Sequence, residues 1–243
     1  MLNNARDDLI GVQNALLRTE NVEQFLHELA VLSTRVVGEG LSCGLTLRPR
    51  GRPPLTVACS DPLASQADGT QYELGDGPCL HAMRLGHPVR IDDMSSHEQW
   101  AEFCEQAATL GLHSAFAVPL FVDGAAAGAL NWYSRKLSAF GEAETKRAET
   151  FARHASGALT LALRLAACTD LNNQLRESMD SRAVIDQALG VIMATEKCPQ
   201  DHAFGILRTV SQNTNVKLRD LASSIVASVS GEPPQPSAPF EDG

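Results

Sequence analysis

The chain has 243 residues and carries 20 Lys and Arg against 29 Asp and Glu, a formal net charge of −9. Apolar residues make up 44% and charged residues 20%, near the average of globular proteins, so a disordered or fibrous chain is excluded. An acidic chain does not bind nucleic acid through its overall field, so any such contact needs a local basic face.

No segment is typical of a membrane span or a secretory leader. The longest stretch without Asp, Glu, Lys or Arg, residues 106–122, is interrupted by polar residues and by Pro119. Residues 1–8 include no basic segment that leads into an apolar run. We therefore expect a cytoplasmic protein with no membrane partner.

The cysteines and histidines do not predict a metal site. The six cysteines lie 16 to 64 residues apart, and no Cys-x-x-Cys pair occurs. This spacing argues against a zinc site and against a disulfide framework in a chain of this size. The histidines are equally dispersed, so we expect no bound metal.

The chain begins with two expected helices. Residues 5–18 have apolar positions at helical spacing, which indicates an amphipathic helix. A second helix is predicted after Asn21, which is a good N-cap. Gln24, three residues later, is placed to hydrogen-bond back to the start of the helix, as in a capping box. Gly38 and Gly40 are expected to end it.

The pattern then changes to strands. Residues 42–47 and 55–59 read as strands that a turn rich in Pro and Gly separates. Residues 77–84 predict a short helix, and residues 88–91 a short strand. Residues 114–122 and 125–133 predict a hairpin around Asp123-Gly124. Helices and about five strands on one chain indicate an α+β sensor-like domain whose antiparallel sheet is flanked by helices.

From residue 142 to residue 196 nothing breaks the helical pattern. Apolar positions step alternately by three and four, the spacing of a two-stranded coiled coil, in which Asn172 would sit at a core position that fixes the register. An ordinary packing helix reuses the same spacing, so both readings stay open. The positions are Phe151, His154, Ala158, Leu161, Leu165, Cys168, Asn172, Leu175 and Met179.

Two short helices are expected after this long one. Cys198-Pro199 opens the first, and Asn215 is expected to cap the second. The segment that follows, residues 231–243, is rich in proline and is expected to be a disordered tail.

Three stretches in the last third of the chain resemble the ANTAR domain. They are SRAVIDQALGVIM at 181–193, AFGILR at 203–208 and SQNTNVKLRDLA at 211–222. Many members carry Lys where this chain has Leu189, so one RNA-facing charge is expected to be missing. The resemblance implies a three-helix RNA-binding module of bacterial transcription antitermination regulators.

Residues 22–165 are similar to a GAF domain. The motifs are GDGPCLHA at 75–82, GHPV at 86–89, VPL at 118–120 and DGAAAGALN at 123–131. Together the two resemblances imply a GAF–ANTAR antitermination regulator of the actinobacterial type, with a sensor at 1–165 and an RNA-binding module with a coiled-coil entry helix at 166–230. They also imply binding to tandem RNA hairpins under the control of a small ligand of unknown identity, or of another signal, at the GAF domain. The seam spacing of the long helix predicts the homodimer that would suit two hairpins.

Cys79 can be read in two ways. It follows Gly77-Pro78 at the start of an expected helix, where backbone amides favour a thiolate, so a redox or ligand-binding role is one reading. The preferred reading is a buried packing residue, since no resolving cysteine lies nearby. The expected ligand pocket consists of Cys79, Met83, Trp100, Phe116, Val118, Asn131 and Tyr133.

Polar and cationic residues of the helical module are the candidates for RNA contact. Phosphate neutralisation needs Lys or Arg gathered on one face, and a helix start adds backbone amides. A solvated charged face is the alternative reading, and the ANTAR resemblance favours RNA. The candidates are Arg182, Gln187, Lys197, Arg208, Asn215, Lys217 and Arg219.

Two other functions remain open at this stage. One is a thiol-dependent enzyme, similar to a sulfoxide reductase, that uses Cys79. The other is a DNA-binding regulator, for which residues 170–229, with 6 basic and 7 acidic residues, supply few cations. The expectation is a regulator without catalytic residues and without an identifiable cofactor.

Overall fold

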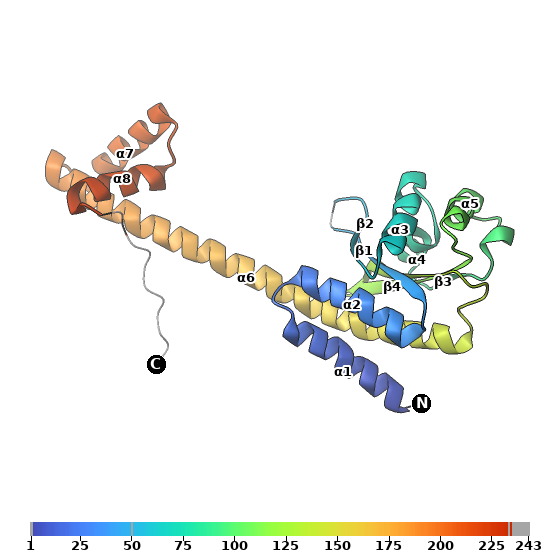
Figure 1. The fold of residues 1–243 in the computed structure, drawn as a ribbon. Coiled ribbons are helices and arrows are strands. Elements are labelled where there is room, and N and C mark those ends of the chain that lie inside the picture. Colours follow the sequence, from blue (N-terminus) through green and yellow to red (C-terminus); the bar gives the residue numbers. More distant parts are fainter. Residues whose placement is uncertain (1, 50, 233, 235–243) are drawn as a thin grey trace. The chain divides into compact units, whose positions relative to one another are not determined.

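The structure is a computed structural model that describes residues 2–49, 51–232 and 234, with side chains described from residue 9 onward (Figure 1). It divides into two compact units, residues 1–166 and 167–243. The long helix α6 (Glu142–Glu196) runs through the boundary between them.

The first unit begins with two helices, α1 (Leu2–Arg18) and α2 (Val22–Val37). Asn21 caps α2 as expected, since its side chain accepts a hydrogen bond from the Gln24 amide at 2.9 Å. The Gln24 side chain in turn accepts from the Glu20 amide at 3.1 Å. This arrangement resembles a capping box, except that Gln24 accepts from the residue before the N-cap, and it sets the start of α2.

The described residues form one five-stranded antiparallel sheet in the order β2-β1-β5-β4-β3. Its strands are β1 (Leu41–Leu47), β2 (Leu55–Cys59), β3 (Val89–Ile91), β4 (Ser114–Val122) and β5 (Ala125–Ser134). The predicted strand positions are confirmed to within one residue.

The β4–β5 hairpin contains a register shift that sequence reasoning does not detect. Asp123 and Gly124 both have positive φ, 50° and 81°, as a two-residue type I′ turn requires. A bulge between Leu120 and Phe121 then moves the pairing by one residue. A one-residue shift changes which side chains share a face of the sheet.

One face of the sheet packs against α2 and the first part of α6, and α1 packs in turn against α2 (Figure 1). Phe116 pairs with Trp132 across the hairpin, and Phe116 also contacts Phe140. The Trp132 indole N–H donates to the Ser33 hydroxyl at 3.1 Å and so ties the sheet to α2. We call this side the helical face; it holds most of the unit's apolar core.

The other face is covered by shorter helices, and we call it the polar face. These are α3 (Pro62–Leu74), α4 (Pro78–Leu85), the 3-10 turn η1 (Met94–Ser96) and α5 (Ala101–Thr109). Asp61 caps α3 by accepting from the Ala64 amide at 3.1 Å, and Pro62 occupies its first turn. Of these elements, α3 and α5 were not predicted from the sequence.

The second unit consists of the last part of α6 with α7 (Gln200–Thr214) and α8 (Leu218–Ser230). Its core is small and aliphatic. Asn215 does not cap α8, contrary to expectation: it ends α7 in the left-handed conformation at φ 54°, and Lys217 is the N-cap of α8. Asn tolerates that conformation better than most residues, which suits it to a helix C-terminus.

The fold confirms the expected α+β class. An antiparallel sheet with flanking helices precedes a long helix and a three-helix module, in the predicted order. The predicted domain boundaries stay predictions. The expected tail lies mostly outside the described residues.

Candidate functional site

A cluster of buried polar side chains fills the polar face between the sheet and α3. At its centre the fully buried Asp68 carboxylate accepts hydrogen bonds from the hydroxyls of Tyr133 at 2.5 Å and Thr56 at 2.9 Å. It also accepts from the Asn131 amide at 3.0 Å. None of the ion pairs among the described residues includes Asp68. The negative charge of its carboxylate is therefore stabilised by hydrogen bonds from uncharged donors.

Further side chains connect this carboxylate to the sheet and to α4. The Tyr72 hydroxyl lies 2.7 Å from the Thr46 hydroxyl, which also accepts from the Asn131 amide at 3.1 Å. The Gln71 amide donates to the Tyr133 hydroxyl at 2.8 Å. We call this connected set the polar cluster; its members are Thr46, Thr56, Asp68, Gln71, Tyr72, Asn131 and Tyr133.

Gly44 of β1 makes room for the carboxylate. A Cβ at this position would lie 2.0 Å from Asp68 Oδ2, closer than any real contact. The glycine is therefore required by close approach of α3 to the strand.

Burial raises the pKa of Asp68 from 3.8 to about 6, although hydrogen bonds from Tyr133, Thr56 and Asn131 oppose the shift. The unfolded chain therefore loses this proton at lower pH than the folded chain does. As the pH rises from about 4 to about 6, the Asp68 contribution to the free energy of unfolding falls, by up to about 3 kcal/mol.

We expect Asp68→Asn to remove this contribution. The Asn side chain can accept from Asn131 and Tyr133 and donate to the Thr56 hydroxyl, so the packing is retained. Urea denaturation of the variant and the parent between pH 4 and 7.5 measures the difference in their free energies of unfolding. Contributions of the other titrating groups, which both proteins share, cancel in this difference. The difference should move in favour of the variant as the pH rises; a difference that stays constant with pH would contradict this assignment.

Cys79 does not have the surroundings of a nucleophile. It is fully buried, its thiol lies 3.4 Å from the Thr46 hydroxyl, and its backbone amide donates to the Gln71 side chain at 2.7 Å. Burial, followed by the charge of Asp68, raises the pKa of the thiol to about 12. The thiol is therefore protonated near neutral pH, which favours the packing reading of Cys79.

The other residues of the expected ligand pocket do not all lie together. Asn131 and Tyr133 belong to the polar cluster, and Met83 packs with Cys79 beside it. Trp100 lies on the same face, only 6% exposed, with its ring 5.1 Å from that of His97 and 5.2 Å from that of His81.

Phe116 and Val118 are the exceptions, because both lie in the apolar core on the helical face. A hairpin without the bulge would pair Phe116 with Asn131, on one face of the sheet. The observed register instead pairs Phe116 with Trp132 and Ala117 with Asn131. Phe116 and Val118 therefore do not line the polar face.

Sequence reasoning missed the residue at the centre of the cluster. Asp68 and its neighbours Gln71 and Tyr72 come from α3, which lacks large apolar residues at helical spacing. Asp61-Pro62 at its start and Gly75 at its end were the available signals.

All seven candidate RNA-binding residues are exposed in the second unit. Three of them line two adjoining hollows on one side of it. The first hollow contains Lys217 and Arg219, and the second contains Arg182. The two share Ser178, Ser181, Ile185 and Leu218, so the start of α8 and residues 178–185 of α6 form one continuous surface.

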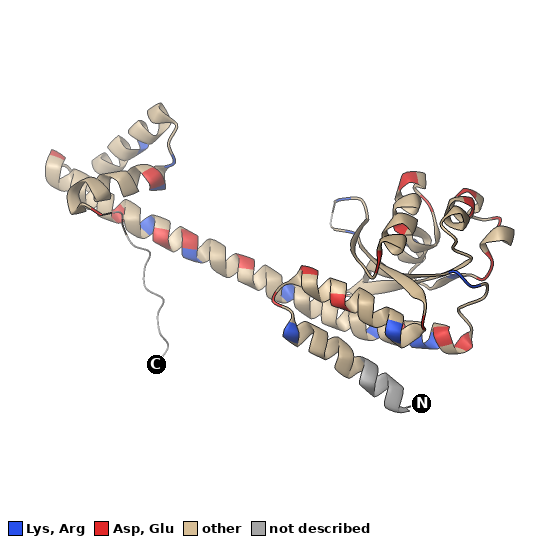
Figure 2. Cartoon of the chain, in the orientation of Figure 1, with Lys and Arg blue, Asp and Glu red and all other residues tan. Residues whose placement is uncertain are grey.

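Other candidates lie elsewhere on this unit. Neither Gln187 nor Lys197 lines either hollow, and Lys197 lies just beyond the end of α6 with φ 51°. Figure 2 shows acidic and basic positions interspersed along the part of α6 that belongs to the second unit. Glu177 lines the first hollow and Asp186 the second, so the cations gather without forming a uniformly positive face.

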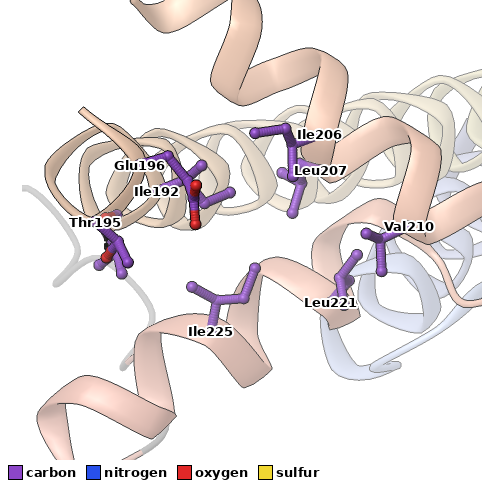
Figure 3. A pocket seen from close by; sticks show the side chains of 9 residues that line it. Ile192, Thr195, Glu196, Ile206, Leu207, Val210, Leu221 and Ile225 are labelled. Atoms are coloured by element: carbon purple, nitrogen blue, oxygen red, sulfur yellow. Dashed lines mark hydrogen bonds between the residues drawn. The ribbon is translucent and has the colours of Figure 1, made fainter. Parts of the chain in front are cut away.

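Leu189 lies where the core of the second unit meets this surface. It is only 4% exposed and packs in the core of the second unit, but it also lines the second hollow together with Arg182, so the expected loss of one RNA-facing charge at this position stays a prediction. A third hollow, of about 230 Å³, lies where the end of α6 meets α7 and α8 (Figure 3). Its lining is mostly aliphatic, which does not suit an anionic ligand.

The described residues include neither a metal-binding cluster nor a membrane-spanning helix. They contain no group of three or more His, Cys, Asp or Glu side chains that could hold a metal ion. No helix among them is both long and apolar enough to cross a membrane.

Two protein-family models match the sequence. The GAF domain model matches residues 19–160, which is more than half of the chain, and the ANTAR domain model matches residues 173–226. No curated protein is similar enough to the sequence to count as a match.

The first unit is similar to solved structures of low sequence identity. A free methionine-R-sulfoxide reductase from Neisseria meningitidis is 20% identical, with a TM-score of 0.52, over 66% of this chain and 91% of that chain. The GAF domain of a phosphoenolpyruvate-protein phosphotransferase from Coxiella burnetii is 18% identical, with a TM-score of 0.50, over 68% of this chain and 97% of that chain. At these identities the likeness establishes the fold alone.

Proposed function

Because this chain belongs to the GAF domain family and carries an ANTAR domain after it, it is an RNA-binding antitermination regulator with a sensory domain, and we propose that it binds hairpins in nascent mRNA. A signal read by the GAF domain controls this binding. The ANTAR domain binds the RNA as part of a homodimer, so that two hairpins in tandem are held together.

The surface at the start of α8 supports RNA binding most directly. Lys217 and Arg219 line a hollow there with two serine side chains, and Arg182 lies in the adjoining hollow. Lys217, the N-cap of α8, makes no side-chain capping hydrogen bond, so the first backbone amides of α8 can donate to a phosphate. Cations beside helix-start amides are suited to phosphate oxygens.

An exposed apolar stripe on α6 supports the homodimer. Leu161, Leu175 and Met179 are 49%, 52% and 69% exposed, and Cys168 and Asn172 between them are exposed as well. Their spacing continues the predicted seam, which a second copy in parallel would cover. The seam cannot begin at Phe151 as predicted, because that side chain is fully buried in the core of the first unit.

The polar cluster supports a sensory role better than a catalytic one. Its charged member is buried among neutral donors, and Cys79 beside it is protonated, so the thiol-dependent enzyme has little support. A ligand with its own hydrogen-bonding groups would have to rearrange this cluster in order to bind. The identity of such a ligand is left open, and the proposal requires only that the GAF domain transmits the signal.

Lys217→Ala tests the RNA-binding surface. We expect it to weaken binding to a fluorescent RNA hairpin and to make the log–log salt dependence shallower by about 0.7 to 0.9, because one phosphate contact is lost. Lys146→Ala, an exposed lysine of the first unit, is the matched control. Anisotropy titrations at two salt concentrations measure both quantities; equal affinities and slopes for Lys217→Ala and the parent would remove this surface from the proposal.

A further inference from the structure

Phe204 is the only Phe, Tyr or Trp between residues 167 and 232, and it lies at the surface. Its side chain is 39% exposed, while its neighbours Ala203 and Leu207 are buried. The core of this unit consists of aliphatic residues. Because aromatic side chains contribute most when they are buried, a lone exposed aromatic residue calls for an explanation.

The surroundings of this ring are mixed: the second hollow is lined by polar side chains, by charges of both signs that include Asp186, and by the aliphatic Ile185, Leu189 and Leu218. Phe204 lines the second hollow together with Arg182 and Gln200. Arg208 follows Phe204 by four residues on α7, as Phe204 follows Gln200, so the three share one helix face. The ring therefore shares a hollow with Arg182 and a helix face with Arg208, beside the hollow that contains Lys217 and Arg219.

This combination fits an unpaired nucleic-acid base better than an apolar protein partner. Bases that a hairpin loop leaves unstacked are bound on aromatic rings, and the phosphates beside them need cations. Gln200 adds a donor and an acceptor that can reach a base edge. An apolar partner would instead leave the arginines without a matching charge.

We propose that Phe204 is the platform on which the ANTAR domain stacks one unpaired base of the hairpin loop, with Arg182 and Arg208 on the flanking phosphates. The inference rests on the proposed function, because it assigns a base-contacting residue to the same RNA. Stacking involves no charge, so the loss of stacking lowers the affinity and leaves the number of released counterions, and with it the salt slope, unchanged. This separates Phe204 from the phosphate-binding cations.

The probe is the tightest-binding member of a pool of tandem RNA hairpins with randomised loops, selected with the full-length parent protein. Phe204→Leu should weaken binding about 5- to 150-fold, the range for one lost stacked base, with the salt slope unchanged. Phe204→Trp, which keeps a stacking face, should bind within about threefold of the parent. Val229→Ala, an exposed apolar site on α8, is the control.

A second readout separates stacking from a structural effect. With 2-aminopurine placed at each loop position in turn, one position should be quenched by the parent and by Phe204→Trp, and not by Phe204→Leu. Circular dichroism checks that each variant is folded. Unchanged affinity of a folded Phe204→Leu, a shallower salt slope, or quenching that persists in that variant would overturn this inference alone. A parent protein that binds no member of the pool would overturn the proposed function as well.

Discussion

Gly44→Ala is expected to destabilise the GAF domain by about 3 kcal/mol, at the upper end of the range for overpacked cores. The new Cβ would lie 2.0 Å from Asp68 Oδ2 and 2.8 Å from its Cγ. This carboxylate cannot move aside easily, because Thr56, Asn131 and Tyr133 all donate to it. Urea denaturation followed by tryptophan fluorescence measures the loss, since Trp100 and Trp132 both lie in the first unit.

A matched glycine and a compensating change keep this prediction testable. Gly69 lies next to Asp68 on α3, and a Cβ there would meet nothing within 4 Å, so Gly69→Ala should be neutral or slightly stabilising. Asp68→Ala should recover part of the loss when it is combined with Gly44→Ala, because the clashing atoms are removed. Parent-like stability of Gly44→Ala, or strictly additive effects of the two changes, would contradict the proposed contact.

Oxidation of the protein is expected to link most chains into covalent dimers through Cys168. This cysteine is exposed and follows Leu161 by seven residues and precedes Leu175 by seven, so it takes a core position of the expected parallel seam. In an in-register dimer the two Cys168 side chains face each other across the axis. Non-reducing electrophoresis after mild oxidation measures the linked fraction, with the partly exposed Cys59 and Cys198 replaced by Ser.

The control moves the thiol away from the seam. Asp170 is exposed and lies two residues from Cys168, on a different side of the helix. Asp170→Cys in the Cys168→Ser background should therefore link poorly at the same protein concentration. Equal linking at the two positions, or sedimentation of the reduced protein as a 26.0 kDa species alone, would rule out the parallel dimer.

Strong local signals in the sequence predict much of this fold. Asn21 with Gln24 sets the start of α2, and Asp123-Gly124 sets the hairpin turn, because each acts through neighbouring backbone groups. The ANTAR motif likewise covers the three helices of the second unit. These features do not depend on distant parts of the chain.

The arrangement of the polar face depends on distant contacts and could not be predicted in the same way. The bulge beside Leu120 shifts the pairing of β4 and β5 by one residue, so that Phe116 and Asn131 lie on opposite faces of the sheet. Nothing in the local sequence reveals this shift. Asp68 becomes central only because α3 brings it to Gly44, far away in the chain. Asn215 shows a third limit, since one residue type serves both as a helix start and as a helix end.

The titration of tandem-hairpin RNA with the full-length parent tests the central claim most directly. Fluorescence anisotropy at fixed salt compares the selected tandem hairpin with one of its hairpins alone and with duplex DNA of equal length. A dimeric RNA-binding regulator should bind the tandem hairpin at least about tenfold more tightly than the single hairpin, because the second contact is intramolecular, and the DNA most weakly. Equal affinity for tandem hairpin, single hairpin and duplex DNA would contradict it.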